Sequence, residues 1–264
     1  MTSSPSYLPP FSSHRILSAA LALLAGAADL PAPENATEPL RACATVPDLG
    51  DLLRRVAGES ARMTVFAKGT EGAHFVEPKP SFIKDLHDAD VFLQIGMELE
   101  TGWAPVLLRN ARNSSILPGG QGHIDASVVI APLEVPMTAI DRSMGDVHPQ
   151  GNPHYLLDPL NAVRVAQLLR DRLAARRPQD RALFDERCLA FTRSVHAALV
   201  GEVLAAKYDA AKLALLFEHG ELASFLEQQG DRDALGGWLG RMLPHFGVKT
   251  FADHNLWPYF ARRF

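Results

Sequence analysis

Three histidines stand at positions from which their imidazole rings could bind a metal ion. His74 lies in GAHFVEPKPS, His154 in GNPHYLLDP and His254 in ADHNLWPYF. Each precedes a predicted helix, and His74 and His254 also follow predicted strands. Because ligands of open α/β sheets collect at the carboxyl ends of the strands, the three rings are placed to converge there. Zinc accepts neutral imidazole nitrogens in tetrahedral geometry, so the predicted chemistry is zinc binding.

The spacing of the three histidines does not by itself establish such a site. They are 80 and 100 residues apart, and the sequence contains neither an HExxH motif nor compact zinc-finger spacing. A single loop histidine is more often a surface residue than a ligand. From residue types alone, three unrelated loop histidines therefore remain the alternative.

Other polar residues near these segments have more than one interpretation. His148, six residues before His154, either assists at the mouth of a cleft or is a solvated loop histidine, and the second is favoured. Glu77 and Asp158 are candidates to orient ligand imidazoles, as carboxylates commonly do. Asp158 precedes Pro159, so it is also a candidate helix N-cap, which we favour slightly.

The elements that would position these residues alternate between helix and strand from Cys43 onward. Strands are predicted at Met63–Ala67, Val91–Ile95, Val128–Ile130 and Val248–Ala252; helices are predicted at Asp48–Val56, Pro80–Ala89, Asp158–Ala175, Leu235–Leu243 and from Leu256 to Phe264. This alternation predicts an α/β fold with a parallel sheet covered by helices on both faces.

One predicted helix is longer than the others. From Gln179 to Lys207 there is no proline, and no glycine before Gly201, while apolar residues recur every three or four positions. The pattern predicts one helix of about 27 residues, roughly 40 Å long. It is either an ordinary core helix or a strut between two lobes.

The N-terminal segment resembles an export signal. An apolar run from Ile16 to Ala25 is too short to span a bilayer, and Ala25-Gly26-Ala27 supplies small residues for a signal peptidase. We therefore predict a signal peptide at residues 1–27 and a Pro-rich linker at 28–42, with an Ala-rich leader as the alternative. Ala27 stands where a lipoprotein would have cysteine, so no lipid anchor is expected.

Composition limits the remaining classes. The formal net charge of −4 over 264 residues provides no basic surface, so no nucleic acid partner is expected. Export would permit a disulfide between Cys43 and Cys188, but two unpaired thiols are an equal alternative because sequence separation says nothing about geometry.

Three longer stretches resemble a known family. GAHFVEPKPSFIKDLHDADVFLQIGMELETGW, MGDVHPQGNPHYLLDPLNA and DHNLWPYFARRF look like successive signatures of the zinc/manganese ABC-transporter solute-binding proteins, in family order. The resemblance runs from Cys43 to Phe264. It implies two α/β lobes joined by one long rigid helix, with the metal held between the lobes.

The resemblance also implies the metal ligands and the metal. It carries the first-lobe ligands onto His74 and His154 and the second-lobe ligand onto His254. Manganese receptors of the family typically have a carboxylate at the third position, whereas zinc receptors have histidine. Since manganese favours oxygen donors and zinc favours imidazole, Zn²⁺ is predicted in preference to Mn²⁺.

The sequence departs from the family pattern at its end. Family members usually contribute a fourth ligand, Asp or Glu, from later in the second lobe, and none is assignable before Phe264. Asp253 is a candidate substitute, although neighbouring strand side chains point to opposite faces. The expected organisation is a first lobe at 43–178, an interlobe helix at 179–208 and an incomplete second lobe at 209–264, with three protein ligands plus water.

The resemblance implies a function in transport without catalysis. The expected protein is a periplasmic receptor, a monomer, that captures zinc and delivers it to an ABC-type permease driven by its ATPase. A metallochaperone or an adhesin on the same fold is the alternative. A zinc hydrolase is disfavoured, because no motif supplies a general base or substrate pocket.

Overall fold

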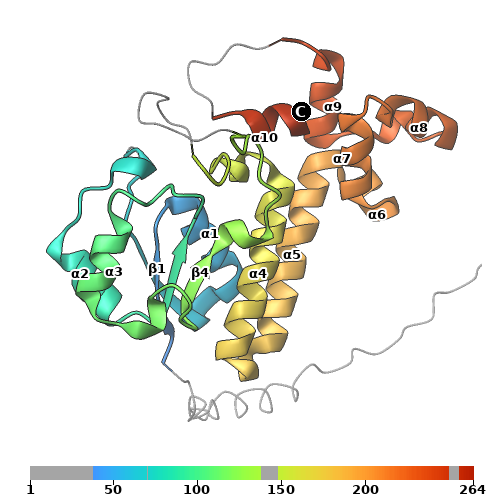
Figure 1. The fold of residues 1–264 in the computed structure, drawn as a ribbon. Coiled ribbons are helices and arrows are strands. Elements are labelled where there is room, and N and C mark those ends of the chain that lie inside the picture. Colours follow the sequence, from blue (N-terminus) through green and yellow to red (C-terminus); the bar gives the residue numbers. More distant parts are fainter. Residues whose placement is uncertain (1–37, 70, 138–147, 250–255) are drawn as a thin grey trace, which may run out of the picture. The chain divides into compact units, whose positions relative to one another are not determined.

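A parallel sheet of four strands lies between two layers of helices (Figure 1). The computed structural model describes residues 38–69, 71–137, 148–249 and 256–264, and the description concerns the unit formed by residues 39–264. The strands are β1 (Leu40–Ala44), β2 (Ala61–Val65), β3 (Val91–Gln94) and β4 (His123–Asp125), arranged in the order β2-β1-β3-β4. The α/β class with a parallel sheet is therefore confirmed.

The first strand corrects the predicted linker. Leu40, Arg41 and Ala42 were assigned to the linker at 28–42, but they belong to β1, which pairs with both β2 and β3. Arg41 is exposed and follows a Pro-rich stretch, so the apolar signal of this strand is short. The strand is nevertheless central, because Ala42, Cys43 and Ala44 are almost fully buried.

The strand predicted at Val128–Ile130 is wrong. The sheet takes β4 from the preceding residues instead, and Ala126–Val129 form a short 3₁₀ helix. Asp125 ends the strand, because its carboxylate accepts hydrogen bonds from the backbone N of Ser127 (2.9 Å) and from Ser127 Oγ (2.6 Å). Such local side-chain bonds offer the backbone an alternative to the sheet.

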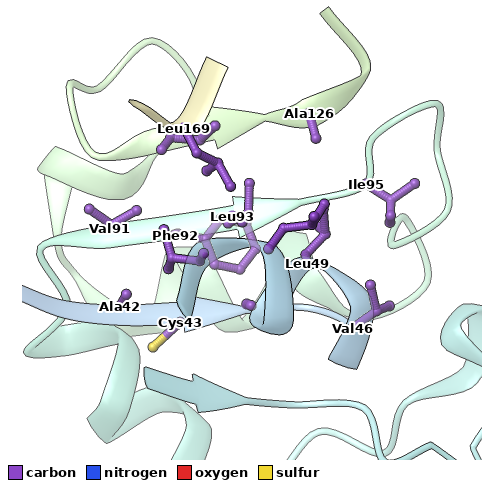
Figure 2. Close-up of a cluster of buried hydrophobic side chains, with 14 of the residues drawn as sticks. Ala42, Cys43, Val46, Leu49, Val91, Phe92, Leu93, Ile95, Ala126 and Leu169 are labelled. Atoms are coloured by element: carbon purple, nitrogen blue, oxygen red, sulfur yellow. The ribbon is translucent and has the colours of Figure 1, made fainter. Parts of the chain in front are cut away.

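Helices cover both faces of the sheet. They are α1 (Pro47–Ala57), α2 (Pro80–His87), α3 (Ala104–Ala111) and α4 (Pro159–Arg176). Each has proline in its first turn, where the missing N–H is not needed. Helices α2 and α3 lie on one side of the sheet, and α1 and α4 on the other (Figure 1). Figure 2 shows Leu49 of α1 and Leu169 of α4 among the buried side chains around β3.

The long helix predicted at 179–207 is two helices. Helix α5 (Arg181–Val200) ends at Gly201, and α6 (Glu202–Lys207) follows it. Gly201 has φ 87° and ψ 153°, a conformation essentially restricted to glycine. A Cβ there would lie 3.1 Å from the Cα of Gly236, whose N–H donates to the carbonyl of Val200. This close approach of two backbones breaks the helix.

Helix α5 contributes to two separate hydrophobic clusters. Phe184 and Cys188, near its start, pack into the cluster around the sheet, whereas Leu199 and Val200, at its end, pack into a second cluster. The second cluster lies among the helices that follow: α7 (Ala210–Glu218), α8 (Leu222–Gln229) and α9 (Gly237–Met242). The last helix, α10, covers Pro258–Arg263. Most of the strand predicted at Val248–Ala252 lies outside the described residues.

Both cysteine side chains are buried and unpaired, so of the two alternatives free thiols are confirmed. Burial raises the pKa of the Cys43 thiol to about 12, which keeps it protonated and unreactive. No helix of the described residues is long and apolar enough to cross a membrane.

Candidate metal centre

His74 lies in a 3₁₀ helix, η2 (Ala73–Phe75), beyond the carboxyl end of β2. The carbonyl of Ala73 accepts a hydrogen bond from the indole Nε1 of Trp103 at 3.0 Å. Trp103 is buried and packs edge-on against Phe66. The segment that carries His74 is therefore tied to the core through the start of α3.

His154 directly precedes the 3₁₀ helix η6 (Tyr155–Leu157). Its backbone N donates to Oδ1 of Asn152 at 3.0 Å, and the hydroxyl of Tyr155 donates to the carbonyl of Ile95, just beyond β3, at 2.8 Å. Burial, followed by the charge of Glu100, raises the pKa of Tyr155 well above its ordinary value, so this hydroxyl stays protonated. His154 is thus held at the carboxyl end of β3.

The structure brings His74 and His154 together, as expected. Their ring centroids are 5.8 Å apart with an interplanar angle of 63°, and both side chains are partly buried. Two imidazoles that share one tetrahedral zinc through bonds of about 2 Å have ring centres about 5 Å apart. The observed separation is on that scale.

His148 joins this pair, although a solvated loop position was favoured for it. Its ring stacks on His74 with centroids 5.1 Å apart and an interplanar angle of 23°. The turn that places it is closed by a hydrogen bond from Gly151 N to the carbonyl of His148 at 3.1 Å. Gly151 has φ +106°, and a Cβ there would lie 2.8 Å from Pro132. The glycine in the sequence between the two histidines was the available signal.

His254 and Asp253 lie outside the described residues. Among the residues that the structure does describe, no three His, Cys, Asp or Glu side chains form a metal-binding group. The imidazoles of His74, His148 and His154 are therefore neighbours without the geometry of a complete ligand set. A cavity of about 290 Å³ adjoins His154, and Ala73, Ile95, Leu256 and Trp257 also line it.

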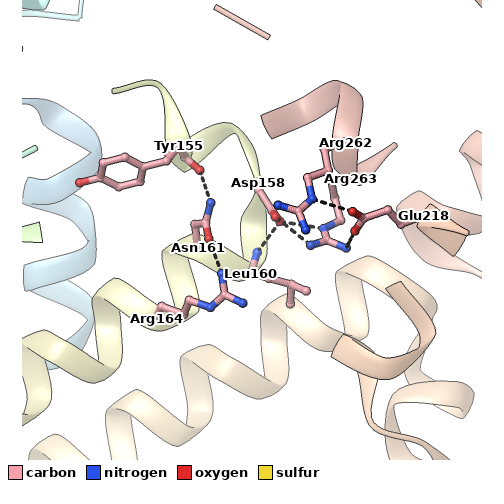
Figure 3. Close-up of polar contacts among 8 residues, drawn as sticks. All are labelled: Tyr155, Asp158, Leu160, Asn161, Arg164, Glu218, Arg262 and Arg263. Atoms are coloured by element: carbon pink, nitrogen blue, oxygen red, sulfur yellow. Dashed lines mark hydrogen bonds and ion pairs between the residues drawn. The ribbon is translucent and has the colours of Figure 1, made fainter. Parts of the chain in front are cut away.

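Asp158 has a different role from orienting an imidazole. Its Oδ1 accepts from the backbone N of Leu160 at 3.0 Å, so Asp158 is the N-cap of α4, as favoured from the sequence. Both carboxylate oxygens also accept hydrogen bonds from the guanidinium of Arg263, each at 2.9 Å (Figure 3). Glu77, the other candidate, is exposed.

The fold and the site define a class: an α/β protein with imidazoles gathered at the carboxyl edge of a parallel sheet. The model of one family, described as zinc-uptake complex component A, periplasmic (ZnuA), matches residues 43–228. The chain belongs to this family.

Two curated relatives show the same relationship at lower coverage. The manganese-binding lipoprotein MntA of Halalkalibacterium halodurans is 29% identical over 136 residues, which are 52% of this chain and 39% of that protein. The zinc-binding lipoprotein AdcA of Streptococcus pneumoniae is 23% identical over 160 residues, 56% of this chain and 29% of that protein. The chain therefore matches well under half the length of either relative.

Solved structures share the fold. A crystal structure of ZnuA superposes with a TM-score of 0.55 at 21% identity, covering 85% of this chain and 67% of that chain. The AdcAII protein of Streptococcus pneumoniae gives a TM-score of 0.54 at 20% identity, covering 86% and 66%. These likenesses extend beyond the sheet into the helices that follow α5.

Proposed function

We propose that this protein is a receptor that captures Zn²⁺ outside the cytoplasm and delivers it to an ABC-type permease and its ATPase. The observation that carries the proposal is the pairing of His74 and His154, whose rings come within 5.8 Å from distant parts of the sequence. The ion is cargo and leaves unchanged, so the protein acts by binding and release rather than as an enzyme.

His254 is proposed as the third ligand. The support is its place in the family motif DHNLWPYF and the position of the residues that follow it. Leu256 and Trp257 line the same cavity as His154. Since two residues of extended chain span about 7 Å, Leu256 limits how far His254 is from this cavity.

Zinc is proposed in preference to manganese because the candidate donors are imidazoles. Borderline zinc binds imidazole well, whereas manganese favours carboxylate and other oxygen ligands. The relatives include a protein named for manganese and one named for zinc. The choice therefore rests on the donor set of this chain.

The proposed organisation extends the predicted first lobe at 43–178 to include all of β1 from Leu40, and keeps an interlobe segment at 179–208 and a second lobe at 209–264. It is supported by the two hydrophobic clusters and by α5, which contributes to both. We further propose that residues 1–27 direct export to the periplasm, in line with the family description, and that the receptor is a monomer.

Isothermal titration of the full chain with zinc tests the proposal. We expect saturable 1:1 binding that weakens at acidic pH, because imidazole must lose its proton to coordinate. His74→Ala and His154→Ala should each weaken binding strongly, whereas His219→Ala, at an exposed position outside the site, should not. A folded full chain that binds no zinc would refute the proposed function.

A further inference from the structure

Glu100 is a buried carboxylate that joins the ends of the two central strands. It is 3% exposed. Its Oε1 accepts from the hydroxyl of Thr45 at 2.7 Å and from the backbone N of Ile95 at 2.8 Å, and its Oε2 accepts from the backbone N of Gly96 at 3.1 Å. Thr45 follows β1, and Ile95 and Gly96 follow β3. The carboxylate therefore lies at the edge of the sheet where the histidines gather.

One path leads from Glu100 to His154. The backbone of Ile95 donates to Glu100 through its N–H and accepts from the hydroxyl of Tyr155 through its carbonyl, at 2.8 Å. Tyr155 is fully buried and directly follows His154. The Glu100 carboxylate thus holds the N–H of Ile95, and the carbonyl of Ile95 holds Tyr155 and with it the His154 segment.

A second path leads to His74. The backbone carbonyl of Glu100 accepts from the N–H groups of Trp103 and Ala104, at 3.1 and 3.0 Å, where α3 begins. The indole of Trp103 in turn donates to the carbonyl of Ala73, the residue before His74. Both histidine segments are therefore connected to Glu100 through a single intermediate residue.

We infer that Glu100 is a positioning residue for zinc capture, which holds the His74 and His154 segments at the spacing that one ion requires. The inference rests on the proposed function. The Glu100 carboxylate accepts hydrogen bonds from one hydroxyl and two backbone amides. None of these donors carries a positive charge that would offset the cost of burying the carboxylate. Burial of a charge is costly. An apolar side chain here would leave two buried N–H groups without an acceptor, and an amide would direct its NH₂ group against one of the three donors. The acid therefore fixes the ends of β1 and β3, from which the His154 segment is held through Ile95.

The surroundings of Glu100 are consistent with this role. Burial raises its pKa to about 7, against the lowering effect of the hydrogen bonds from Thr45, Ile95 and Gly96. Asp125, at the end of β4, raises it further. The carboxylate form, which accepts from all three donors, therefore predominates only above neutral pH.

The experiment compares the full-length wild type with E100Q, T45V and T45S. Zinc affinity is measured by competition with a chromophoric chelator, and the visible ligand-field spectrum of bound Co²⁺ reports the geometry of the ligands. We expect E100Q to weaken zinc binding by about tenfold or more, as for other partners that orient metal ligands, and to change the Co²⁺ band intensity. T45V should shift both readouts in the same direction, and T45S, which keeps the hydroxyl, should restore them.

A folded E100Q with wild-type affinity and Co²⁺ spectrum would overturn the inference. A purely structural role would lower the thermal midpoint while leaving the spectrum of the metal-loaded protein unchanged, and that result would overturn it too. If E100Q does not fold, T45V against T45S decides between the same outcomes. A wild type that binds no zinc would instead refute the proposed function, so the two failures are distinguishable.

Discussion

At the scale of single residues, His148 is held against His74, with ring centroids 5.1 Å apart. From this proximity we predict that His148 assists the proposed binding of zinc at His74. We predict that His148→Ala weakens zinc binding by about tenfold, the lower end of the range for partners of a metal site, and less than His154→Ala does. Isothermal titration measures the zinc affinity of each variant. His245→Ala, at an exposed position, is the matched control, and equal affinities for the two variants would remove His148 from the site.

The raised pKa of Glu100 predicts how the stability of the fold depends on pH. Burial raises its pKa from 4.5 to about 7 in the folded state, so between these values the folded chain holds a proton that the unfolded chain has lost. The contribution of this group to stability is therefore present at low pH and falls as pH rises through this window. We therefore expect the free energy of unfolding of metal-free E100Q to lie below that of the wild type by a smaller amount at pH 8 than at pH 5.

Urea denaturation at the two pH values measures this difference. The other titratable groups are common to both proteins and cancel in the comparison. Glu59→Gln, at an exposed position, should show no such pH-dependent difference. A difference between wild type and E100Q that is independent of pH would mean that Glu100 is ionised alike in the folded and unfolded chain.

The residues of the site differ in how far the sequence reveals them. The proximity of His74 and His154 was predicted from the family resemblance of their motifs, because residue types and spacing alone left unrelated loop histidines as the alternative. The approach of His148 to His74 depends on the turn at Gly151: the glycine is visible in the sequence, but its φ of +106° and the resulting approach of the two rings are not. Glu100 gave no signal, since its bond to Thr45 joins residues 55 positions apart and requires the parallel pairing of β1 with β3.

At the scale of elements, the ion pair between Asp158 and Arg263 joins the start of α4 to α10. The two side chains are 7% and 8% exposed and meet through two hydrogen bonds of 2.9 Å. Breaking a buried pair leaves an uncompensated charge. We predict that Asp158→Asn, which keeps the N-cap, destabilises the fold by about 3 kcal/mol. Glu218, 3.7 Å from the Arg263 guanidinium, moderates the loss.

A double-mutant cycle checks this prediction by urea denaturation. Arg263→Met alone should also destabilise, because Asp158 keeps a buried charge. The double variant should be less destabilised than the sum of the two single variants, since no unpaired charge remains. Asp51→Asn, which removes an exposed pair with Arg55, should change stability by only about 0.5 kcal/mol. Additive losses at Asp158 and Arg263 would show that the pair contributes no coupling.

The elements were predictable where the local pattern was uninterrupted. The apolar run of β3 and the proline-initiated helices α2 and α4 were expected nearly as observed. The break after α5 was not, because the contact of Gly201 with Gly236 joins residues that periodicity treats separately. Similarly, the end of β4 depends on the Asp125–Ser127 hydrogen bonds rather than on hydrophobicity.

At the scale of the whole molecule, the end of the chain returns to the segments that carry the histidines. The hydroxyl of Tyr259, in α10, accepts from the backbone N of Leu133 at 3.0 Å, and its ring meets that of Tyr155 edge-on. Arg262, in the same helix, binds Glu218 of α7. Helix α10 therefore links the second hydrophobic cluster to the neighbourhood of His154.

This linkage predicts that zinc stabilises the whole chain in one transition. A ligand that binds only the folded state adds about 2.7 kcal/mol at a free concentration 100 times its Kd. We therefore expect the thermal midpoint of the full chain to rise with zinc and to return when a chelator is added. Calorimetry measures the shift. Mg²⁺, which prefers oxygen ligands, should give no shift, and neither should zinc added to a His74→Ala/His154→Ala double variant. A zinc-dependent shift that survives in this double variant would place the binding site elsewhere on the protein.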